Sequence, residues 1–269
     1  MKKVLFIIDS FPNYSETFLY NQIYFLLDCG IEVDVIAIKK KFFSENVFHQ
    51  KMIEYRLNER VGFLRKGINL ILLINLLIYP VLSFKILLNY GLKKSLFFIQ
   101  NIDLFTRSRK YDVVHAHYGH IGALVGDLRK IGIFKNQRLI CSFHGEELLP
   151  IHLDSYQLRY FNMLKFFDVI TANSNYIRGL ILKSLKGSDK ITFVLPESLD
   201  TTYFGNLDQR IVKKDYFSIL FIGRLIEWKA PILAIQIVEK LLKLNYNVRL
   251  DIVGSGPEYD RCFNYIKKK

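Results

Sequence analysis

The sequence has little cysteine, proline or tryptophan, and its acidic residues are outnumbered by its basic ones. Its 269 residues include three cysteines, six prolines and one tryptophan. Three scattered cysteines form neither a disulfide framework nor a metal-ligand pattern, so they indicate reduced thiols in a cytoplasmic protein. The hydrophobic fraction of 51% is high enough for a large buried core and argues against disorder.

The chain also lacks a convincing signal peptide at its start. The apolar run after Lys3 is interrupted at Asp9, and no small-residue cleavage site follows it. We therefore interpret these residues as a first β-strand.

The basic excess is local. There are 38 basic and 25 acidic residues, a formal net charge of +13. Between Arg60 and Lys110 lie nine bases and one acid, Asp103, so this stretch alone contributes +8. An anionic membrane surface or a phosphorylated substrate fits such a local excess, and we predict no nucleic-acid partner.

Hydrophobic periodicity alternates between strand and helix along most of the chain. The β-strand–helix–β-strand order forces parallel sheets covered by helices, and this α/β pattern predicts two Rossmann-like domains. We place a complete domain at residues 1–205 and a partial one at 206–269. The predicted strands are Lys3–Asp9, Ile31–Ile38, Tyr111–His115, Arg138–Phe143, Asp168–Ala172, Ile191–Leu195, Phe217–Ile222 and Val248–Val253. The predicted helices are Ser15–Cys29, Ile121–Ile131, Tyr156–Phe166, Tyr176–Leu185, Pro231–Leu244 and Pro257–Ile266.

An apolar helical insertion, flanked by basic residues, interrupts the first domain at about residues 60–110. Its segment Gly67–Leu88 is long enough to suggest a transmembrane helix. Asn75, Pro80 and Lys85 interrupt it, and a single span would separate two halves of one sheet. Two alternatives remain: helices lying on a bilayer, or a buried helical hairpin. In the first, basic residues would face the lipid headgroups, namely Arg60, Arg65, Lys66, Lys93 and Lys94.

A candidate phosphate site follows the first strand of the second domain. Gly223 permits a tight turn, and Arg224 and Lys229 precede the helix that begins at Pro231. Two cations beside a helix N-terminus suit a diphosphate, although a solvated loop is the plainer reading of Arg and Lys alone. The glycine turn at Gly254 ends the next strand at the same edge. Neither turn has the Gly-x-Gly-x-x-Gly pattern, so no dinucleotide cofactor is predicted.

Histidines cluster at strand ends in the first domain. His115 and His117 follow one strand and His144 follows the next, with Glu147 nearby. We expect the side chains of the first pair to point to opposite faces, so no metal site is predicted. A polar contact to a sugar fits better, although a hydrogen-bonded core histidine is the simpler interpretation of each one alone.

These motifs together resemble the retaining GT4 family of GT-B glycosyltransferases, especially its bacterial exopolysaccharide and O-antigen members. The similar segments occur in family order over nearly the whole chain: Phe11–Phe18, Asp112–Gly119, Ser142–Glu147, Ile170–Ile177, Val194–Phe204, Phe221–Pro231 and Asp251–Pro257.

The resemblance implies roles for particular residues. Arg224, Lys229, Glu227 and Gly223 would bind the donor diphosphate. His144 and Glu147 would be catalytic and lie near the transferring sugar. Ser15, Glu16 and His117 would border the cleft on the acceptor side. Family members need no metal, and the nucleotide sugar is a substrate, so no cofactor is expected.

The sequence departs from the family pattern at several positions. Ser198 and Ala230 replace residues that are usually or frequently glycine. The paired glutamates of the family, seven residues apart, are expected beyond Lys269, so we expect the second domain to be truncated and activity to be impaired.

We predict a glycosyltransferase that moves a hexose from a nucleotide diphosphate sugar to a glycan or lipid-linked glycan in cell-surface polysaccharide biosynthesis. It would be cytoplasmic, with peripheral association with the inner face of the membrane as an added expectation. A sugar-nucleotide epimerase of the same fold is the rival enzyme, and it would need no acceptor. A truncated fragment or binding module is the non-enzymatic rival.

Overall fold

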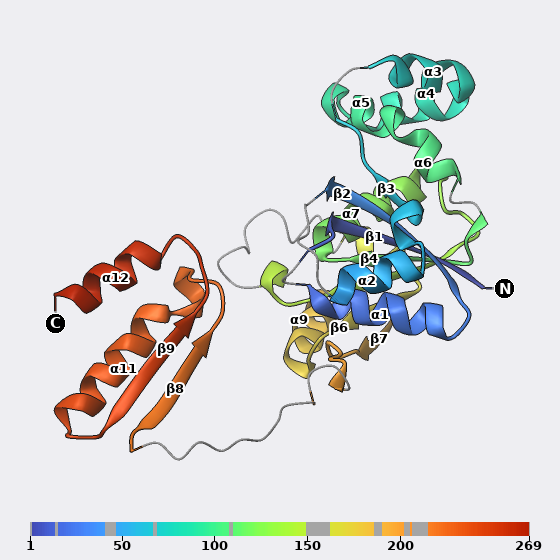
Figure 1. The fold of residues 1–269 in the computed structure, drawn as a ribbon. Coiled ribbons are helices and arrows are strands. Elements are labelled where there is room, and N and C mark those ends of the chain that lie inside the picture. The colour runs from blue at the N-terminus through green and yellow to red at the C-terminus, as the bar shows by residue number, and fades with distance from the viewer. Residues whose placement is uncertain are drawn as a thin grey trace. The chain divides into compact units, whose positions relative to one another are not determined.

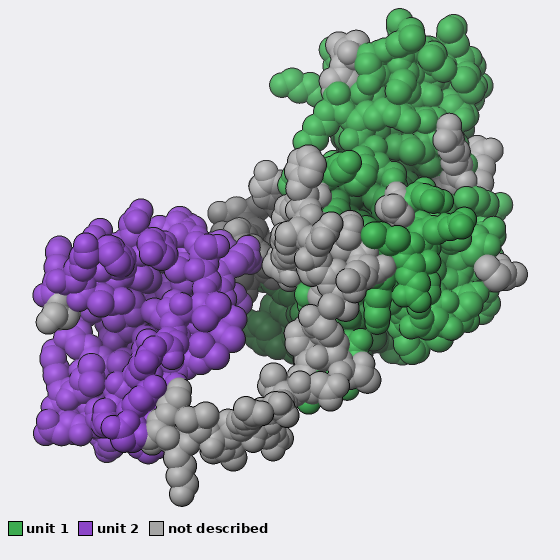
Figure 2. All heavy atoms as spheres, viewed as in Figure 1, with its two compact units in different colours: residues 1–205 green, residues 206–269 purple. Residues whose placement is uncertain are grey.

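The computed structural model describes most of the chain as two compact units. The described residues are 2–13, 16–40, 47–66, 69–107, 110–148, 162–185, 190–201, 205 and 215–268. Unit 1 comprises residues 1–205 and unit 2 residues 206–269 (Figures 1 and 2). Residues 202–204 and 206–214, around the boundary of the two units, lie outside the described residues, as does most of the helix expected at Tyr156–Phe166.

Unit 1 is built on a parallel sheet of seven strands in the order β3-β2-β1-β4-β5-β6-β7. This confirms the predicted α/β fold with a parallel sheet. Sequence analysis missed β3, which lies inside the expected insertion. The strands are β1 (Lys3–Phe11), β2 (Glu32–Lys40), β3 (Val61–Phe63), β4 (Val113–His117), β5 (Arg138–Phe143), β6 (Val169–Ala172) and β7 (Ile191–Val194).

Helices cover the two faces of this sheet and bury a separate apolar cluster on each. On one face α1 (Thr17–Asp28), α2 (Val47–Glu54) and the short helix η1 (Leu57–Arg60) enclose a cluster that includes Phe6 and Tyr20. On the other, α7 (Gly119–Lys130) and α9 (Asn175–Leu185) pack over a cluster that includes Leu5 and Phe143. The alternation of Leu5 and Phe6 between the clusters follows the two-residue period of a strand.

Helix α7 approaches β5 unusually closely, because it has glycine at the contact. A Cβ atom added to Gly122 would lie 2.6 Å from Sγ of Cys141, a fully buried side chain. Packing at this density leaves no room for a methyl group.

The expected insertion forms four helices: α3 (Leu70–Ile78), α4 (Pro80–Asn89), α5 (Leu92–Gln100) and α6 (Ile102–Arg107). Figure 1 shows α3, α4 and α5 as a group above the sheet, with α6 nearest to it. A polar network joins them. Arg65 pairs with Asp103 through both guanidinium nitrogens at 2.6 and 3.1 Å, and buried Asn75 donates to the carbonyl of Ile99 at 2.9 Å. Lys94 forms an ion pair with Asp127 of α7. The expectation that Arg65 and Lys94 face lipid is therefore wrong, because both are bound to carboxylates.

The inner and outer faces of α3 and α4 are both apolar. Leu72 and Ile86 are buried in the core cluster. The outer face exposes a stripe with helical spacing, in which Leu77 is 82% exposed and Leu70 is 70% exposed. The hairpin is therefore buried on one face only. The exposed apolar face, as we call it, comprises Leu70, Leu73, Ile74, Leu77, Ile78, Val81, Phe84, Leu87, Leu88 and Leu92.

Among the described residues, no single helix has the length and apolar composition needed to cross a membrane. The pair α3 and α4 meets both criteria together, but its two helices are bent by 107° at Tyr79.

Unit 2 contains two parallel strands, β8 (Phe217–Ile222) and β9 (Val248–Val253). Two helices, α11 (Pro231–Lys243) and α12 (Tyr259–Lys267), accompany them. One face of the sheet carries the exposed side chains of Leu220, Ile222 and Val253. Unit 2 is thus a partial Rossmann-like domain, as predicted.

Substitution of Gly122 by alanine tests the close approach of α7 to β5. Gly122→Ala should lower the free energy of unfolding by about 1–3 kcal/mol, since overpacking exceeds the gain of about 1 kcal/mol in helix propensity. Gly179→Ala, in α9 with nothing within 4 Å of the added Cβ, is the matched control and should be neutral or stabilising. Urea unfolding of both variants measures the difference, and equal effects would contradict the packing argument.

Candidate active site

The predicted site residues of the first domain lie at the carboxyl edge of the unit 1 sheet. His117 ends β4, His144 follows β5, and Glu16 lies between β1 and α1. The pairing of β1 with β4 and of β4 with β5 brings these strand ends together. Ligands of open α/β sheets bind at this edge. Ser15 lies outside the described residues.

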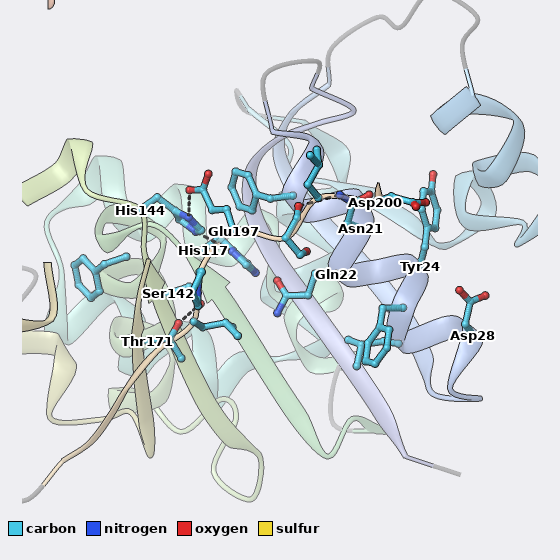
Figure 3. Close-up of a pocket in the computed structure, with 18 of the residues that line it drawn as sticks. Asn21, Gln22, Tyr24, Asp28, His117, Ser142, His144, Thr171, Glu197 and Asp200 are labelled. Atoms are coloured by element: carbon cyan, nitrogen blue, oxygen red, sulfur yellow. Dashed lines mark hydrogen bonds and ion pairs between the residues drawn. The ribbon is translucent and has the colours of Figure 1, made fainter. Parts of the chain in front are cut away.

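His117 and His144 form a hydrogen-bonded pair (Figure 3). Nδ1 of His117 is 3.0 Å from Nε2 of His144, and Nδ1 of His144 is 3.2 Å from Oε1 of Glu197. Aromatic rings fix both imidazoles: Phe6 stacks on His117 at 5.3 Å between ring centroids, and Phe18 lies 4.6 Å from His144. The pair is therefore rigidly placed at the end of the sheet.

His115 lies two residues before His117 on β4, and its side chain is on the same face of the sheet as that of His117. The rings of His115 and His117 are stacked with their centroids 4.2 Å apart. The expectation that their side chains point to opposite faces is wrong, because residues two apart on a strand share a face. Nε2 of His115 is 2.7 Å from Oγ of Ser142, which lies 2.5 Å from Oγ1 of Thr171.

Burial keeps both strand histidines neutral. Loss of hydration lowers the pKa of His115 from 6.5 to about 3, with a further contribution from His144. The same burial lowers the pKa of His117 well below 6.5. Within the described ranges, no three His, Cys, Asp or Glu side chains are placed to hold a metal ion.

Glu147 holds two loops at this edge. Its Oε1 accepts hydrogen bonds from the backbone N–H of His144 at 3.1 Å and of Gly119 at 3.4 Å. Gly119 is the first residue of α7, so the carboxylate lies at the positive end of a helix. The observed contacts of Glu147 position the backbone of His144, and its predicted catalytic role stays a prediction.

Glu16 connects the loop before α1 to the same edge. Its Oε1 accepts a hydrogen bond from Nδ2 of Asn13 at 2.6 Å. Burial together with the nearby Glu16 carboxylate raises the pKa of Tyr118, whose ring centroid lies 4.7 Å from that of His144. Tyr118 thus lies between the Glu16 carboxylate and the ring of His144. The predicted acceptor-side role of Glu16 stays a prediction.

A cavity of about 600 Å³ opens beside the histidines. It lies within unit 1, between α1 and the segment that follows β7, and residues of both line it (Figure 3). His117 and His144 form one end of the wall, and Tyr24 and Asp28 of α1 line another part. The volume is in the usual range for small-molecule sites.

Glu197, Ser142 and Thr171 were not identified by sequence analysis as site residues. Ser142 lies on β5, Thr171 lies on β6, and Glu197 lies on the segment after β7, at the edge where the histidines were expected. Their position relative to the strand ends was the signal that could have revealed them.

The predicted diphosphate-binding residues lie on one loop of unit 2. Gly223 and Arg224 follow β8, and Glu227 and Lys229 bound the short helix η5 (Glu227–Lys229) before α11. The side chains of Arg224, Glu227 and Lys229 are exposed. A charged loop that leads into a helix N-terminus can bind an anion.

Close backbone packing shapes this loop. The N–H of Leu225 donates to the carbonyl of Ser255 at 2.9 Å, and a Cβ added to Gly254 would lie 1.9 Å from the carbonyl oxygen of Gly223. Ala230, where glycine is frequent in similar sequences, has a φ of 52°, which glycine adopts more readily. The two strand-end turns of unit 2 are thus packed directly against each other.

Comparison with known proteins shows the family. Residues 15–202 match the family model described as Glycosyltransferase Family 4, and residues 206–269 match the model described as Glycosyl transferases group 1. The chain belongs to glycosyltransferase family 4. The curated relative WcaL of Escherichia coli strain K12, described as a putative colanic acid biosynthesis glycosyltransferase, is 27% identical over 99% of this chain and 67% of its own length.

Solved structures share the fold at low sequence identity. HepE of Anabaena, determined in complex with UDP and glucose, gives a TM-score of 0.63 at 16% identity, over 100% of this chain and 64% of that one. TarM of S. aureus gives a TM-score of 0.63 at 10% identity, over 100% of this chain and 74% of that one. The chain thus spans roughly two thirds of the length of the relatives it matches.

The neutral buried histidines predict a stability that falls in mild acid. Unfolded His115 and His117 bind protons below their ordinary pKa of about 6.5, whereas the folded forms do not until the pH is much lower. The free energy of unfolding should therefore decrease as pH falls from about 7 to 5, by up to about 1.4 kcal/mol per pH unit for each histidine.

Urea unfolding across this pH range measures the slope. His115→Asn should reduce it, whereas His120→Gln, a control at a half-exposed histidine, should change it less. An equal slope in wild type and His115→Asn would contradict neutral burial of His115.

Proposed function

We propose that this chain is the acceptor side and part of the donor side of a retaining glycosyltransferase. It moves a hexose from a nucleotide diphosphate sugar to a glycan or lipid-linked glycan in cell-surface polysaccharide biosynthesis. The observation that carries the proposal is the set of Glu16, His117 and His144 at the carboxyl edge of the sheet, beside a cavity of about 600 Å³. The colanic acid description of WcaL and the UDP and glucose bound to HepE support the pathway and the donor class.

In the proposed reaction, negative charge develops on the leaving diphosphate and positive charge on the transferring sugar. The bond between the anomeric carbon and the diphosphate breaks, and its electron pair goes to the leaving oxygen. A hydroxyl oxygen of the acceptor binds the carbon, and its proton passes to an oxygen of the departing diphosphate. Arg224 and Lys229, with the first amides of α11, stabilise the negative charge on the diphosphate. Glu227 and Gly223 belong to the same loop and contribute to the diphosphate site. His144, with Glu147 holding its backbone, contacts the transferring sugar.

Neither a cofactor nor a metal is part of this proposal, because the protein's own cations neutralise the leaving group and the nucleotide sugar is a substrate. No nucleic-acid partner is proposed. We propose that the reaction takes place in the cytoplasm, at the inner face of the cell membrane.

Substitution of Arg224 tests the donor site. Arg224→Ala should weaken binding of a nucleoside diphosphate by about tenfold or more, because a hydrogen bond to a charged group contributes about 1.5–3 kcal/mol. Arg249→Ala removes another exposed arginine of unit 2, one that pairs with Asp251 at 3.0 Å, and serves as the control. Calorimetric titration with UDP, ADP and GDP measures the affinity.

Steady-state transfer assays, on a version of the chain joined to a complete second domain, complete this test. His144→Ala should reduce turnover more than affinity for the diphosphate, since a contact to the sugar matters mostly at the transition state. Normal turnover in His144→Ala would assign this histidine a structural role. Equal diphosphate binding by Arg224→Ala and Arg249→Ala would remove Arg224 from the donor site.

A second proposal is that the exposed apolar face binds an anionic membrane surface. Soluble proteins rarely expose so many contiguous large apolar side chains. The described part of the insertion has no acid between Glu59 and Asp103, whereas Lys66, Lys85 and Lys93 are exposed. An apolar face bordered by lysines is suited to the boundary between lipid headgroups and acyl chains.

Vesicle flotation tests the membrane proposal. Wild type should bind vesicles that contain anionic lipid, with less binding to neutral vesicles and at high salt, because each lysine near the surface contributes about 1 kcal/mol. The double variant Leu77→Glu, Phe84→Glu should lose binding, whereas Leu182→Glu on α9 should retain it. Absence of binding in wild type, or equal binding by the double variant, would contradict the proposal.

A further inference from the structure

We propose that Glu197 is a positioning residue that fixes the tautomers of His144 and His117. Nε2 of His117 is then left as a hydrogen-bond acceptor for a hydroxyl group of a ligand in the cavity. The identity of that hydroxyl, as one on the acceptor glycan, rests on the proposed transfer function. The tautomers themselves do not depend on it.

The three side chains form a line that ends at a carboxylate. Oε1 of Glu197 lies 3.2 Å from Nδ1 of His144, and Nε2 of His144 lies 3.0 Å from Nδ1 of His117. An ionised carboxylate only accepts hydrogen bonds, so Nδ1 of His144 must carry the proton. In a neutral imidazole the other nitrogen is then an acceptor.

The same reasoning passes from His144 to its partner. Because Nε2 of His144 accepts, Nδ1 of His117 must donate, and Nε2 of His117 is left without a proton. The opposite order would direct the lone pair of Nδ1 of His144 at the carboxylate. Burial lowers the pKa of His117, which supports the neutral form that this order requires.

The far end of the line is Nε2 of His117, in the wall of the cavity. His117 is 1% exposed and lines the cavity, and its Nε2 is a buried atom with no hydrogen-bond partner among the described residues. Figure 3 shows its ring directed to the cavity side. A buried acceptor without a partner is costly, so a ligand that donates a hydrogen bond there gains affinity. Sugar hydroxyls are donors of this kind.

Packing holds the line in register. Phe18 and Tyr118 contact the ring of His144 at centroid distances of 4.6 and 4.7 Å, and Asn173 donates to its backbone carbonyl at 2.8 Å. These contacts fix the ring position without choosing a tautomer. Glu197, on the segment after β7, makes that choice.

Nitrogen NMR of the full chain with labelled histidine tests the proposal directly. At about pH 8, where histidines are neutral, long-range proton–nitrogen spectra distinguish protonated from bare ring nitrogens. In wild type we expect Nδ1 to be protonated and Nε2 bare in both His144 and His117. In Glu197→Ala, we expect His144 to shift toward the Nε2–H form and His117 to reverse with it.

Asp200→Asn is the matched control, because it removes a carboxylate from the same segment, where Asp200 pairs with Lys51 at 3.6 Å. It should leave both tautomers unchanged. An Nε2–H tautomer of either histidine in wild type overturns the proposal, as does an unchanged pattern in a folded Glu197→Ala variant. If that variant does not fold, the wild-type spectrum alone decides. Failure of the transfer assays with the expected tautomers would count against the proposed function only.

Discussion

The parallel pairing of β1, β4 and β5 is the constraint on which the candidate site depends. Phe6 is in register with His115, and His117 with Ser142, so these side chains share one face of the sheet. Because all three strands end at the same edge, His117 at the end of β4 meets His144 after β5, and the loop after β1 brings Glu16 to the same edge. The apolar clusters that hold the sheet together therefore also determine the geometry of the polar groups.

Burial of imidazoles at this edge has a chemical consequence. Burial removes the hydration that stabilises a charged imidazole, so a buried histidine stays neutral. It then interacts through hydrogen bonds, with one donor and one acceptor nitrogen. Unit 1 therefore offers directional contacts, of the kind that orient a sugar, while the cations that suit a diphosphate, Arg224 and Lys229, lie on unit 2.

Sequence periodicity was sufficient for most of the sheet, because strands buried on both faces read as continuous apolar runs. It was insufficient for β3, which has three residues and follows no long apolar run. The expected strand ends placed His117 and His144 at one edge of the sheet, where the structure has them. Side-chain partners could not be predicted from the sequence. Arg65 and Lys94 were interpreted as free surface cations, but they bind Asp103 and Asp127, which are 38 and 33 residues away in the chain. Glu197 was passed over since its partner His144 is 53 residues distant.

The insertion shows why apolar periodicity alone could not separate a buried hairpin from a surface one. Leu72 and Asn75 on the inner face of α3 are buried. The side chain of Asn75 donates hydrogen bonds to backbone carbonyls, which in this buried place have no water to bind. Leu73 and Leu77 on the outer face are exposed, although they are as apolar as the buried Leu72. A helix apolar all round needs a partner on both sides. One partner is the core of unit 1. The polar network of Arg65, Asn75 and Asp103 holds the helices in place, and the exposed apolar face remains on the outside of the hairpin.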